Sequence, residues 1–373
     1  MDKLEITAVE TIAVLAKLDR TYQGSFYSMP SRATIITRVH TADGIVGEAY
    51  NADSDLEQAE IVGIIRSELT PRVLGANALQ VERCWELMQP PTFDQLRDRR
   101  LTQQAIAAVD TAIWDAVGKA LGQPLHRLWG GYRDVMPIIV IGGYYEVPGK
   151  PTIEEEVSAY SEAGFAGMKF KIGGRTPEED ALRLHRAVEA TRDGFRFVVD
   201  ANQGYTLRQA VRFVDLVREF VDVEWFEEPC RWRNDHRDMA TFRAITGVPV
   251  AAGQSEISAG AMRDMMERGS IDVSNFDASW GGGPTEWRRV AAMAHTYGVR
   301  LGHHEEPQVA GHLLASQPHS TFVEVFNPAR DPVFWNMIVN RPPIGDGVIQ
   351  LPTGPGLGWV LDGDFIDRYR VHD

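Results

Sequence analysis

From about residue 136 onward, short apolar segments alternate with longer amphipathic ones, and this alternation constrains the fold more than any other feature of the chain. The short segments have the length of β-strands, and the segments between them have the periodicity of helices. Strands are expected at residues 137–141, 167–171, 195–199, 223–226, 248–252, 271–273, 299–302 and 321–325. No strong Gly-x-Gly-x-x-Gly turn marks a dinucleotide crevice, so eight alternating strands favour a closed parallel barrel over an open sheet.

The last predicted strand is followed by chain that is rich in Pro and Gly rather than by a clear helix. The expected architecture is therefore a modified TIM barrel of the (β/α)7β type, which occupies residues 136–330. The stretch after it, residues 340–373, is expected to pack back on the first domain.

The first third of the chain follows another pattern, in which alternating apolar residues predict strands and Asp43-Gly44 is a hairpin signal. Strands are expected at residues 4–18, 33–40 and 45–48, and helices at residues 56–69, 78–88 and 101–121. Residues 1–125 are therefore expected to form an α+β capping domain within an α/β protein. Residues 21–31 are aromatic but too polar for a strand, and they predict a loop or a lid.

Composition argues against several classes of function. The chain has 373 residues, of which 44% are hydrophobic and 24% charged, as in an ordinary soluble globular protein. The formal net charge of −14 argues against binding to nucleic acid or to a membrane surface, since both attract clustered Lys and Arg. No apolar run approaches the roughly 20 residues that span a bilayer. Acidic residues near the N-terminus disfavour an export signal, so a cytoplasmic protein is expected.

Two lysines, Lys169 and Lys171, stand one residue apart at the end of the second predicted strand of the barrel. Side chains on a strand alternate between its faces, so both ammonium groups are expected to point the same way. Crowding of like charge and burial both lower the pKa of a lysine, and one of the two could act as a base near neutral pH. An isolated Lys-x-Lys is more often only a pair of solvated side chains at a strand end, so a catalytic role depends on the residues at the ends of the neighbouring strands.

Carboxylates stand at the ends of the next three predicted strands. They are Asp200, Glu227 and Glu256, and about one βα unit separates each from the next. The C-terminal strand ends of a parallel barrel meet at one face, where its active site lies. Three unpaired carboxylates at one point would repel each other, so a hard divalent cation is the expected partner, and Mg²⁺ fits best. Taken singly, each acid could instead be an exposed loop residue.

Polar motifs stand at the other strand ends as well. The motifs are Lys-Phe-Lys at 169–171, Val-Asp-Ala-Asn-Gln at 199–203, Trp-Phe-Glu-Glu-Pro at 225–229, Asp277-Ala278 followed by Gly282-Gly283, His304 followed by His312-Leu313-Leu314-Ala315, and Glu324. In this combination and order, the chain resembles the enolase superfamily, and within it the mandelate racemase subgroup, over nearly its whole length.

The resemblance implies that Asp200, Glu227 and Glu256 bind Mg²⁺. At the third ligand the chain departs from the commonest family pattern, in which an acid directly follows the glycine, because Gln254 stands at that place. A shift of two residues gives the role to Glu256. Whether Glu256 or Gln254 completes the metal site stays open at the level of the sequence.

The resemblance also implies the chemistry, which is abstraction of the proton α to a carboxylate. Together with the metal ion, Lys169 and a protonated Glu324 would stabilise the negative charge that develops on the substrate carboxylate. Lys171 would be a base on one face of the substrate. His304 would stand on the opposite face, with its imidazole oriented by Asp277.

Substrate binding is expected from Lys169, from Asn202, which shares a face with Asp200, and from the segment 21–31. Within that segment, Tyr22 is the residue that we expect to contact the substrate. The partner implied by the family is a small-molecule carboxylate. Relatives assemble as symmetric homo-oligomers, from dimers to octamers, and the same is expected of this chain.

Acid–base groups on both faces permit either dehydration or return of the proton to the other face. Among relatives with both Lys-x-Lys and a His–Asp pair, dehydration of an acid sugar to a 2-keto-3-deoxy acid is the commoner outcome. The expected activity is thus that of a carbon–oxygen lyase acting on a substrate such as galactarate, galactonate or lyxonate. A racemase, an epimerase or a cycloisomerase of a carboxylate is the alternative, and a non-catalytic binding protein is a third hypothesis.

Overall fold

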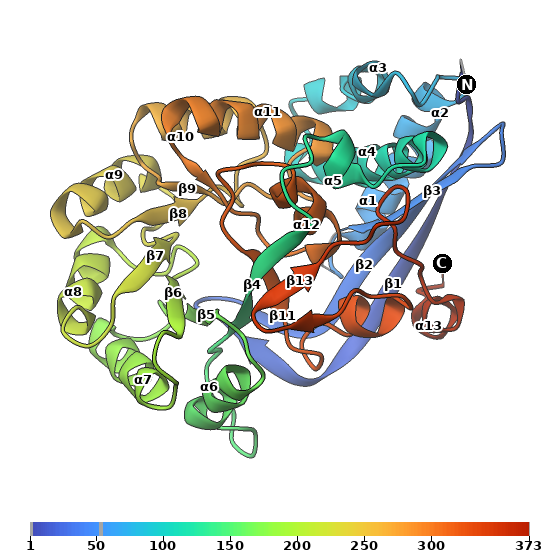
Figure 1. Cartoon of the computed structure of the whole chain (residues 1–373). Coiled ribbons are helices and arrows are strands. Elements are labelled where there is room, and N and C mark those ends of the chain that lie inside the picture. The colour runs from blue at the N-terminus through green and yellow to red at the C-terminus, as the bar shows by residue number, and fades with distance from the viewer. Residues whose placement is uncertain (1–2, 52–54, 373) are drawn as a thin grey trace.

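A computed structural model describes residues 3–51 and 55–372 of the chain. The long strands of an N-terminal domain lie beside a barrel of shorter strands, and the chain returns from the barrel to the N-terminal domain at its C-terminal end (Figure 1). Met1 and Asp2, which belong to the segment that disfavours an export signal, lie outside the described residues, and so do residues 52–54.

The N-terminal domain is built on an antiparallel sheet with the strand order β1 (Ile6–Gln23), β2 (Ser28–Thr41) and β3 (Val46–Asn51). The predicted hairpin turn at Asp43-Gly44 joins β2 to β3. Gly44 has a φ of 76°, a backbone conformation that glycine adopts without steric cost.

The aromatic segment 21–31 is more regular than the predicted loop. β1 runs on to Gln23 and β2 starts at Ser28, so residues 24–27 form the turn of a long hairpin in which Tyr22 pairs with Met29. Polar residues are accommodated there because they alternate with buried ones, as in any strand with a single buried face. Tyr22 is buried, whereas Thr21 and Gln23 are exposed.

Helices cover the sheet of the capping domain. They are α1 (Gln58–Ile64), α2 (Thr70–Val73), α3 (Val81–Leu87), α4 (Arg99–Leu121) and α5 (Leu125–Leu128), with a π-helical turn at Ile65–Leu69 and a 3-10 turn at Pro90–Phe93. Helix α4 begins at Asp98, whose carboxylate accepts a hydrogen bond from the Arg100 N–H, and it ends at Gly122 in the left-handed conformation. Because α4 packs on β2, β3 and α11 (Gly283–Tyr297), it joins the capping domain to the barrel.

The barrel strands are parallel and follow each other in chain order. They are β4 (Val135–Gly142), β5 (Gly167–Lys171), β6 (Arg196–Asp200), β7 (Val223–Glu227), β8 (Val250–Ala252), β9 (Val273–Ser274), β10 (Arg300–Leu301) and β11 (Val323–Phe326). β11 pairs with β4, and a parallel bridge between Leu301 and Ser320 joins β10 to the chain that enters β11. The predicted fold class, a barrel-like parallel sheet with an N-terminal capping domain, is confirmed.

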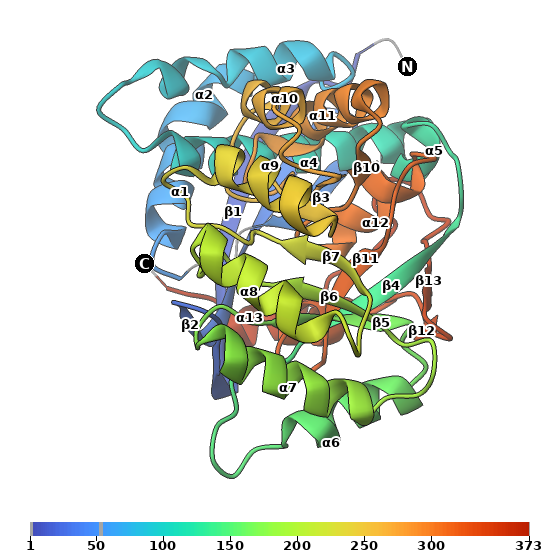
Figure 2. The same ribbon diagram turned by 90° about the vertical axis from the view of Figure 1, so that its left-hand side faces the viewer.

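Helices surround the barrel on the outside, as Figure 2 shows for α7 and α8 in front of β5 and β6. They are α6 (Ile153–Glu162), α7 (Pro177–Glu189), α8 (Leu207–Val217), α9 (Asp235–Thr246), α10 (Ala259–Glu267), α11 and α12 (Pro307–Ala315). Thr152, Thr176 and Thr206 begin α6, α7 and α8 with reciprocal capping boxes. After β11 the chain enters a π-helical turn at Val333–Met337.

A layer of apolar side chains fills the barrel below its C-terminal strand ends. Val198 on β6 and Trp225 on β7 belong to this layer, and Trp225 stacks on Phe322 with ring centroids 5.6 Å apart. Because side chains on a strand alternate, the residues two positions further on, Asp200 and Glu227, project to the same side one layer higher. The apolar layer therefore forms the floor beneath the polar strand ends.

The C-terminal segment contacts both domains. Its first part forms β12 (Ile344–Gly345) and β13 (Val348–Gln350), and β13 pairs antiparallel with the start of β4. Its second part ends in α13 (Gly363–Tyr369), after which Arg370 bridges to Val14 on β1.

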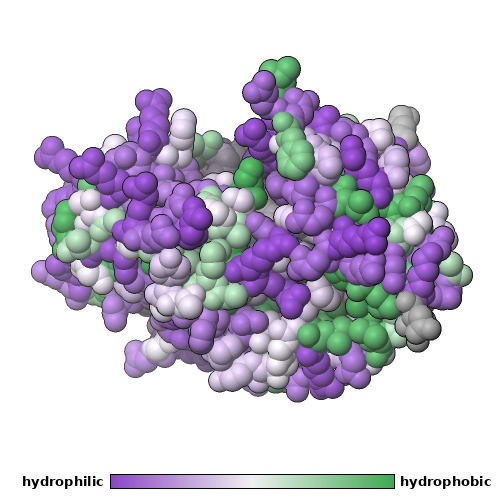
Figure 3. Space-filling view, turned by 90° about the horizontal axis from the view of Figure 1, so that it is seen from above, coloured by the Kyte–Doolittle hydropathy of each residue, from purple (hydrophilic) through white to green (hydrophobic). Residues whose placement is uncertain are grey.

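Among the described residues, no helix combines the length and the apolar character needed to cross a membrane. The face of the molecule shown in Figure 3 is covered mainly by hydrophilic side chains, with smaller hydrophobic areas between them.

Candidate active site

The polar strand ends meet at the C-terminal mouth of the barrel. Parallel pairing puts Lys171 on β5 level with Asp200 on β6, and Asp200 level with Glu227 on β7. Lys169, Asp200 and Glu227 are all fully buried, although each carries an ionisable group. Buried charges are costly unless they are paired, so their mutual contacts decide whether this arrangement is stable.

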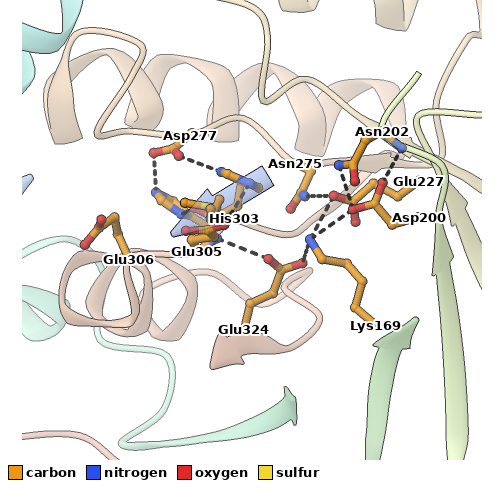
Figure 4. A network of polar contacts seen from close by, with 12 residues as sticks. Lys169, Asp200, Asn202, Glu227, Asn275, Asp277, His303, Glu305, Glu306 and Glu324 are labelled. Carbon is orange, nitrogen blue, oxygen red and sulfur yellow. Dashed lines mark hydrogen bonds and ion pairs between the residues drawn. The ribbon is translucent and has the colours of Figure 1, made fainter. Parts of the chain in front are cut away.

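Lys169 lies at the centre of this group (Figure 4). Its Nζ is 2.7 Å from Glu324 Oε1, 2.9 Å from Glu227 Oε1 and 3.9 Å from Asp200 Oδ2. Asn275 Nδ2 also donates a hydrogen bond to Glu227 Oε1, at 3.0 Å. The ammonium group thus links carboxylates from β6, β7 and β11.

Lys171 pairs with Asp200, at 2.6 Å between Nζ and Oδ2, and its ammonium also lies about 6 Å from the ring centroids of Tyr27 and Tyr144. The sequence predicted a lowered pKa for one lysine, but the pKa of both lysines is raised. Burial acts to lower the pKa of Lys171, yet the charge of Asp200 outweighs it. For Lys169, Glu227 and Glu324 outweigh burial in the same way.

The carboxylates respond in opposite directions. Burial raises the pKa of Glu227 to about 8, against the opposing charge of Lys169. Burial acts to raise the pKa of Asp200 too, but Lys171 and Lys169 outweigh it and hold that pKa below its ordinary value. Asp200 is therefore the carboxylate that these lysines keep ionised.

His304 faces the same mouth from the loop after β10. Its Nδ1 donates a hydrogen bond to Asp277 Oδ2 at 2.9 Å, and Asp277 Oδ1 in turn accepts one from the Ser279 N–H at 2.7 Å. This pairing fixes the proton on Nδ1, and Nε2 lies 3.4 Å from Oε1 of Glu305, which also lines the cavity. Burial, followed by the charges of Lys169 and Lys171, lowers the pKa of His304 well below its ordinary value.

The neighbouring His303 has a different environment. Its Nε2 accepts a hydrogen bond from the Ala278 N–H at 3.0 Å, and its Nδ1 donates to the His304 carbonyl oxygen at 2.9 Å. Both ring nitrogens are engaged with backbone, and burial lowers the pKa of His303 to about 4. His303 therefore fixes the loop, while His304 reaches the cavity.

The third predicted metal acid, Glu256, is not brought together with Asp200 and Glu227. Its Oε1 lies 3.2 Å from His236 Nε2 on α9, at the side of the barrel. Gln254, two residues earlier, lines the central cavity instead. Among residues 3–51 and 55–372, no group of three His, Cys, Asp or Glu side chains is arranged to hold a metal ion.

The central cavity, of about 360 Å³, lies between the barrel mouth and the capping domain. His304, Asn202, Gln254 and Trp280 line it from the barrel. Asn202 donates from its backbone N–H to Asp200 Oδ1 at 2.8 Å and from Nδ2 to Asp200 Oδ2 at 3.0 Å. Its amide oxygen has no hydrogen-bond partner within the described part of the chain.

Two family profiles match the chain. One, Enolase C-terminal domain-like, matches residues 152–365, and the other, Mandelate racemase / muconate lactonizing enzyme, N-terminal domain, matches residues 6–130. The chain belongs to the enolase superfamily. Within it, the chain falls in the mandelate racemase/muconate lactonizing enzyme subgroup, as the strand-end motifs predict.

Relatives in the superfamily differ in their reactions. The chain is 30% identical to 3,6-anhydro-alpha-L-galactonate cycloisomerase from Streptomyces coelicolor, over 90% of this chain and 91% of the relative. It is 29% identical to arabinonate dehydratase from Saccharolobus solfataricus, over 90% of each chain. A mandelate racemase/muconate lactonizing enzyme from a marine actinobacterium, solved with magnesium, is 52% identical, has a TM-score of 0.91 and is covered over its whole length by 99% of this chain.

Magnesium is therefore the metal that the superfamily implies, and the oxygen atoms at the barrel mouth fit it. Glu227 Oε2 and Gln254 Oε1 are buried and accept no hydrogen bond from any described residue. A buried oxygen without a partner is unfavourable by about 1–3 kcal/mol, so a bound cation or water would stabilise it. Oxygen donors of this kind are what Mg²⁺ prefers.

Much of the cavity lining comes from the capping domain. Residues 27–31 of the predicted segment 21–31 line the cavity, whereas Asp55, Leu56, Glu57, Arg100 and Gln104 were not predicted from the sequence. Within the segment 21–31, the residue that was singled out differs. Tyr22 packs edge-on against Tyr144, with ring centroids 5.2 Å apart, in an apolar cluster with Ile141 and Phe326, whereas Tyr27 lines the cavity.

Proposed function

We propose that the protein is a Mg²⁺-dependent acid sugar dehydratase, which removes the proton α to a carboxylate and eliminates the β-hydroxyl to give a 2-keto-3-deoxy acid. The observation that supports this most is the meeting of two acid–base systems at one cavity mouth. Lys169 and Lys171 stand among carboxylates on one side, and His304 with Asp277 stands on the other.

Each residue has a role that its surroundings favour. Lys169, with Glu324 beside it, would bind the substrate carboxylate and stabilise its developing negative charge. When bound to Asp200 and Glu227, Mg²⁺ would add a positive charge at the same place. Asn202 would donate to or accept from a substrate hydroxyl.

The proton transfers follow from the charge states of the two acid–base groups. His304 is neutral near pH 7 because its pKa is lowered by burial and by the lysines, so Nε2 can accept the α-proton. Lys171 is an ammonium group because its pKa is raised, so Nζ can give a proton to the departing β-hydroxyl. The C–O bond breaks, one water leaves, and the resulting enol tautomerises to the keto acid.

A cycloisomerase or a racemase of a carboxylate is the second candidate. It is favoured by the 30% identity to a cycloisomerase over nearly the full length of both chains. The same first step, removal of an α-proton, serves all these reactions. They differ in whether the β-substituent leaves, and the residues that contact the distal part of the substrate determine that outcome.

The test is incubation of the purified protein with Mg²⁺ and a library of mono- and diacid sugars in D₂O. A dehydratase gives a product lighter by one water that reacts as a 2-keto acid. A racemase or epimerase gives α-deuterium without keto acid, and a cycloisomerase gives an isomer of unchanged composition. No product and no α-deuterium with any acid would support the binding-protein hypothesis and contradict the proposal.

We also propose that the protein forms a homo-oligomer, because this is expected from its membership of the superfamily. Sedimentation velocity of the purified chain at micromolar concentration measures it directly. A single species of two or more subunits supports the proposal, and a monomer contradicts it.

A further inference from the structure

The loop after β8 brings Gln254, rather than Glu256, to the barrel mouth. Gly253 has a φ of 127°, and a Cβ there would lie 2.7 Å from the Met262 side chain, so only glycine fits. The Glu256 N–H donates to the Gly253 carbonyl oxygen at 3.1 Å and closes a tight turn. Gln254 is the second residue of this four-residue turn and lines the cavity, and Glu256 is its last residue.

Hydrogen bonds of Ser255 with Glu228 and Gln203 stabilise this conformation of the turn. Ser255 Oγ donates to Glu228 Oε1 at 3.2 Å, and Gln203 Nε2 donates to both of these oxygens, at 3.1 and 3.0 Å. Glu256 already has a partner in His236, and its side chain is 23% exposed. For Glu256 to reach Asp200, the turn and these hydrogen bonds would have to open.

Gln254 has the features that Glu256 lacks. It is 8% exposed, it lines the cavity, and its Oε1 is a buried acceptor without a partner in the described chain. At the end of the preceding strand, β7, Glu227 Oε2 likewise has no hydrogen-bond partner among the described residues. Two buried oxygens without donors, at the ends of the neighbouring strands β7 and β8, are acceptors of the kind that a hard divalent cation binds.

We infer that Gln254 Oε1 is the third protein ligand of the divalent cation, together with Asp200 and Glu227, and that Glu256 is not a ligand. This inference rests on the proposed Mg²⁺-dependent function. The ligand set then carries two negative charges instead of three. A site with one carboxylate fewer binds its cation more weakly, and it attracts an anionic substrate more strongly because less of the cation's charge is neutralised.

The test measures metal binding without any turnover. Mg²⁺ affinity is measured by calorimetry, and Mn²⁺ affinity by the electron paramagnetic resonance signal of the free ion. Gln254→Leu removes the amide oxygen at nearly constant volume, and Glu256→Leu is the matched control two residues away. We expect Gln254→Leu to raise the Kd about tenfold or more, and Glu256→Leu to change it by less than about twofold.

A third variant adds charge instead of removing a ligand, so that it stays informative if Gln254→Leu fails to fold. Gln254→Glu is expected to lower the Kd for Mg²⁺ about tenfold or more, because a carboxylate replaces an amide on the cation. Circular dichroism and Tm of each variant without metal verify that the fold is retained.

The inference is overturned if Glu256→Leu weakens metal binding as much as Gln254→Leu does, or if Gln254→Glu leaves the Kd unchanged. Absence of Mg²⁺ and Mn²⁺ binding to the unmodified protein at millimolar concentration overturns it together with the metal dependence of the proposed function. If the expected order of affinities is found but no acid sugar is dehydrated, the ligand inference stands and the dehydratase proposal fails.

Discussion

The chemistry of single side chains at the barrel mouth depends on what each one contacts, and His304 illustrates this well. Asp277 accepts a hydrogen bond from Nδ1, Trp280 packs with its ring centroid 5.0 Å from that of the imidazole, and Nε2 lies beside Glu305 in the cavity wall. Asp277 is itself held by the Ser279 N–H. The orientation of the imidazole is thus determined before a substrate arrives, which lowers the cost of reaching the reactive geometry.

The first prediction concerns Asp277. Asp277→Asn keeps the size of the side chain but can donate to Nδ1, so it stabilises the tautomer with the proton on Nε2. We expect kcat for the accepted acid sugar, or for α-deuterium exchange, to fall about 10²- to 10⁴-fold while KM changes little. Steady-state kinetics with the wild-type protein as reference measures both. A decrease in kcat smaller than about fivefold would show that Asp277 does not orient the imidazole of His304.

At the scale of elements, Arg32 joins strand β2 to the segments that follow β10 and β11. This arginine on β2 is fully buried, and it contacts Glu306 at 2.8 Å, Asp331 at 3.3 Å and Glu305 at 3.8 Å. Glu305 and Glu306 form the loop after β10, where both have positive φ angles of 49° and 42°. A capping-domain residue therefore holds the loop that carries His304.

The second prediction follows from this cross-domain ion pair. Arg32→Met would leave buried carboxylates without their partner, and we expect the free energy of unfolding to fall by about 3–5 kcal/mol. Urea denaturation monitored by fluorescence measures the change. Arg38→Met is the matched control, because Arg38 on the same strand pairs with Glu48 in a partly exposed position, and we expect a loss of about 1 kcal/mol or less. Equal losses in the two variants would contradict the structural role of Arg32.

The sequence predicts elements well where a simple period governs them. Each barrel strand overlaps an apolar run that the sequence predicts as a strand, because burial between the barrel interior and an outer layer of helices requires apolar residues. The long hairpin at residues 21–31 is not predicted, because its polar residues alternate over only a few positions. The sequence does not predict that Gln254 lines the cavity while Glu256 pairs with His236, because the turn that begins at Gly253 does not follow the two-residue period of a strand.

At the scale of the whole molecule, buried histidines link stability to pH. Burial lowers the pKa of His303 to about 4 and that of His312 to about 3, and both residues are fully buried. In the unfolded chain a histidine has a pKa of about 6.5. Below pH 6.5 the unfolded chain therefore binds protons that the folded chain does not, and the folded state loses stability as the pH falls.

The third prediction is that His303 lowers the free energy of unfolding as the pH falls from 6.5 to 4, while Glu227, whose pKa is raised to about 8, acts in the opposite direction, so the His303 contribution is the difference between the wild type and His303→Gln. One histidine whose pKa drops to about 4 accounts for a loss of about 3 kcal/mol over that interval. Urea denaturation at each pH measures the slope. His303→Gln, which titrates in neither state, should have a slope smaller by one proton below pH 6. An unchanged slope in that variant would show that His303 is not neutral in the folded protein.

The central claim is that Lys171 and His304 move protons at the α-carbon of a carboxylate substrate. It is tested most directly by following the α-proton signal of an accepted acid sugar by NMR, in D₂O with Mg²⁺, in the wild-type protein and in His304→Asn. The account predicts rapid loss of the α-proton with formation of keto acid in the wild type, and at least a hundredfold slower loss in His304→Asn. Keto acid that carries the former α-proton at C3 instead of deuterium from the solvent, or equal rates in the two proteins, would contradict it.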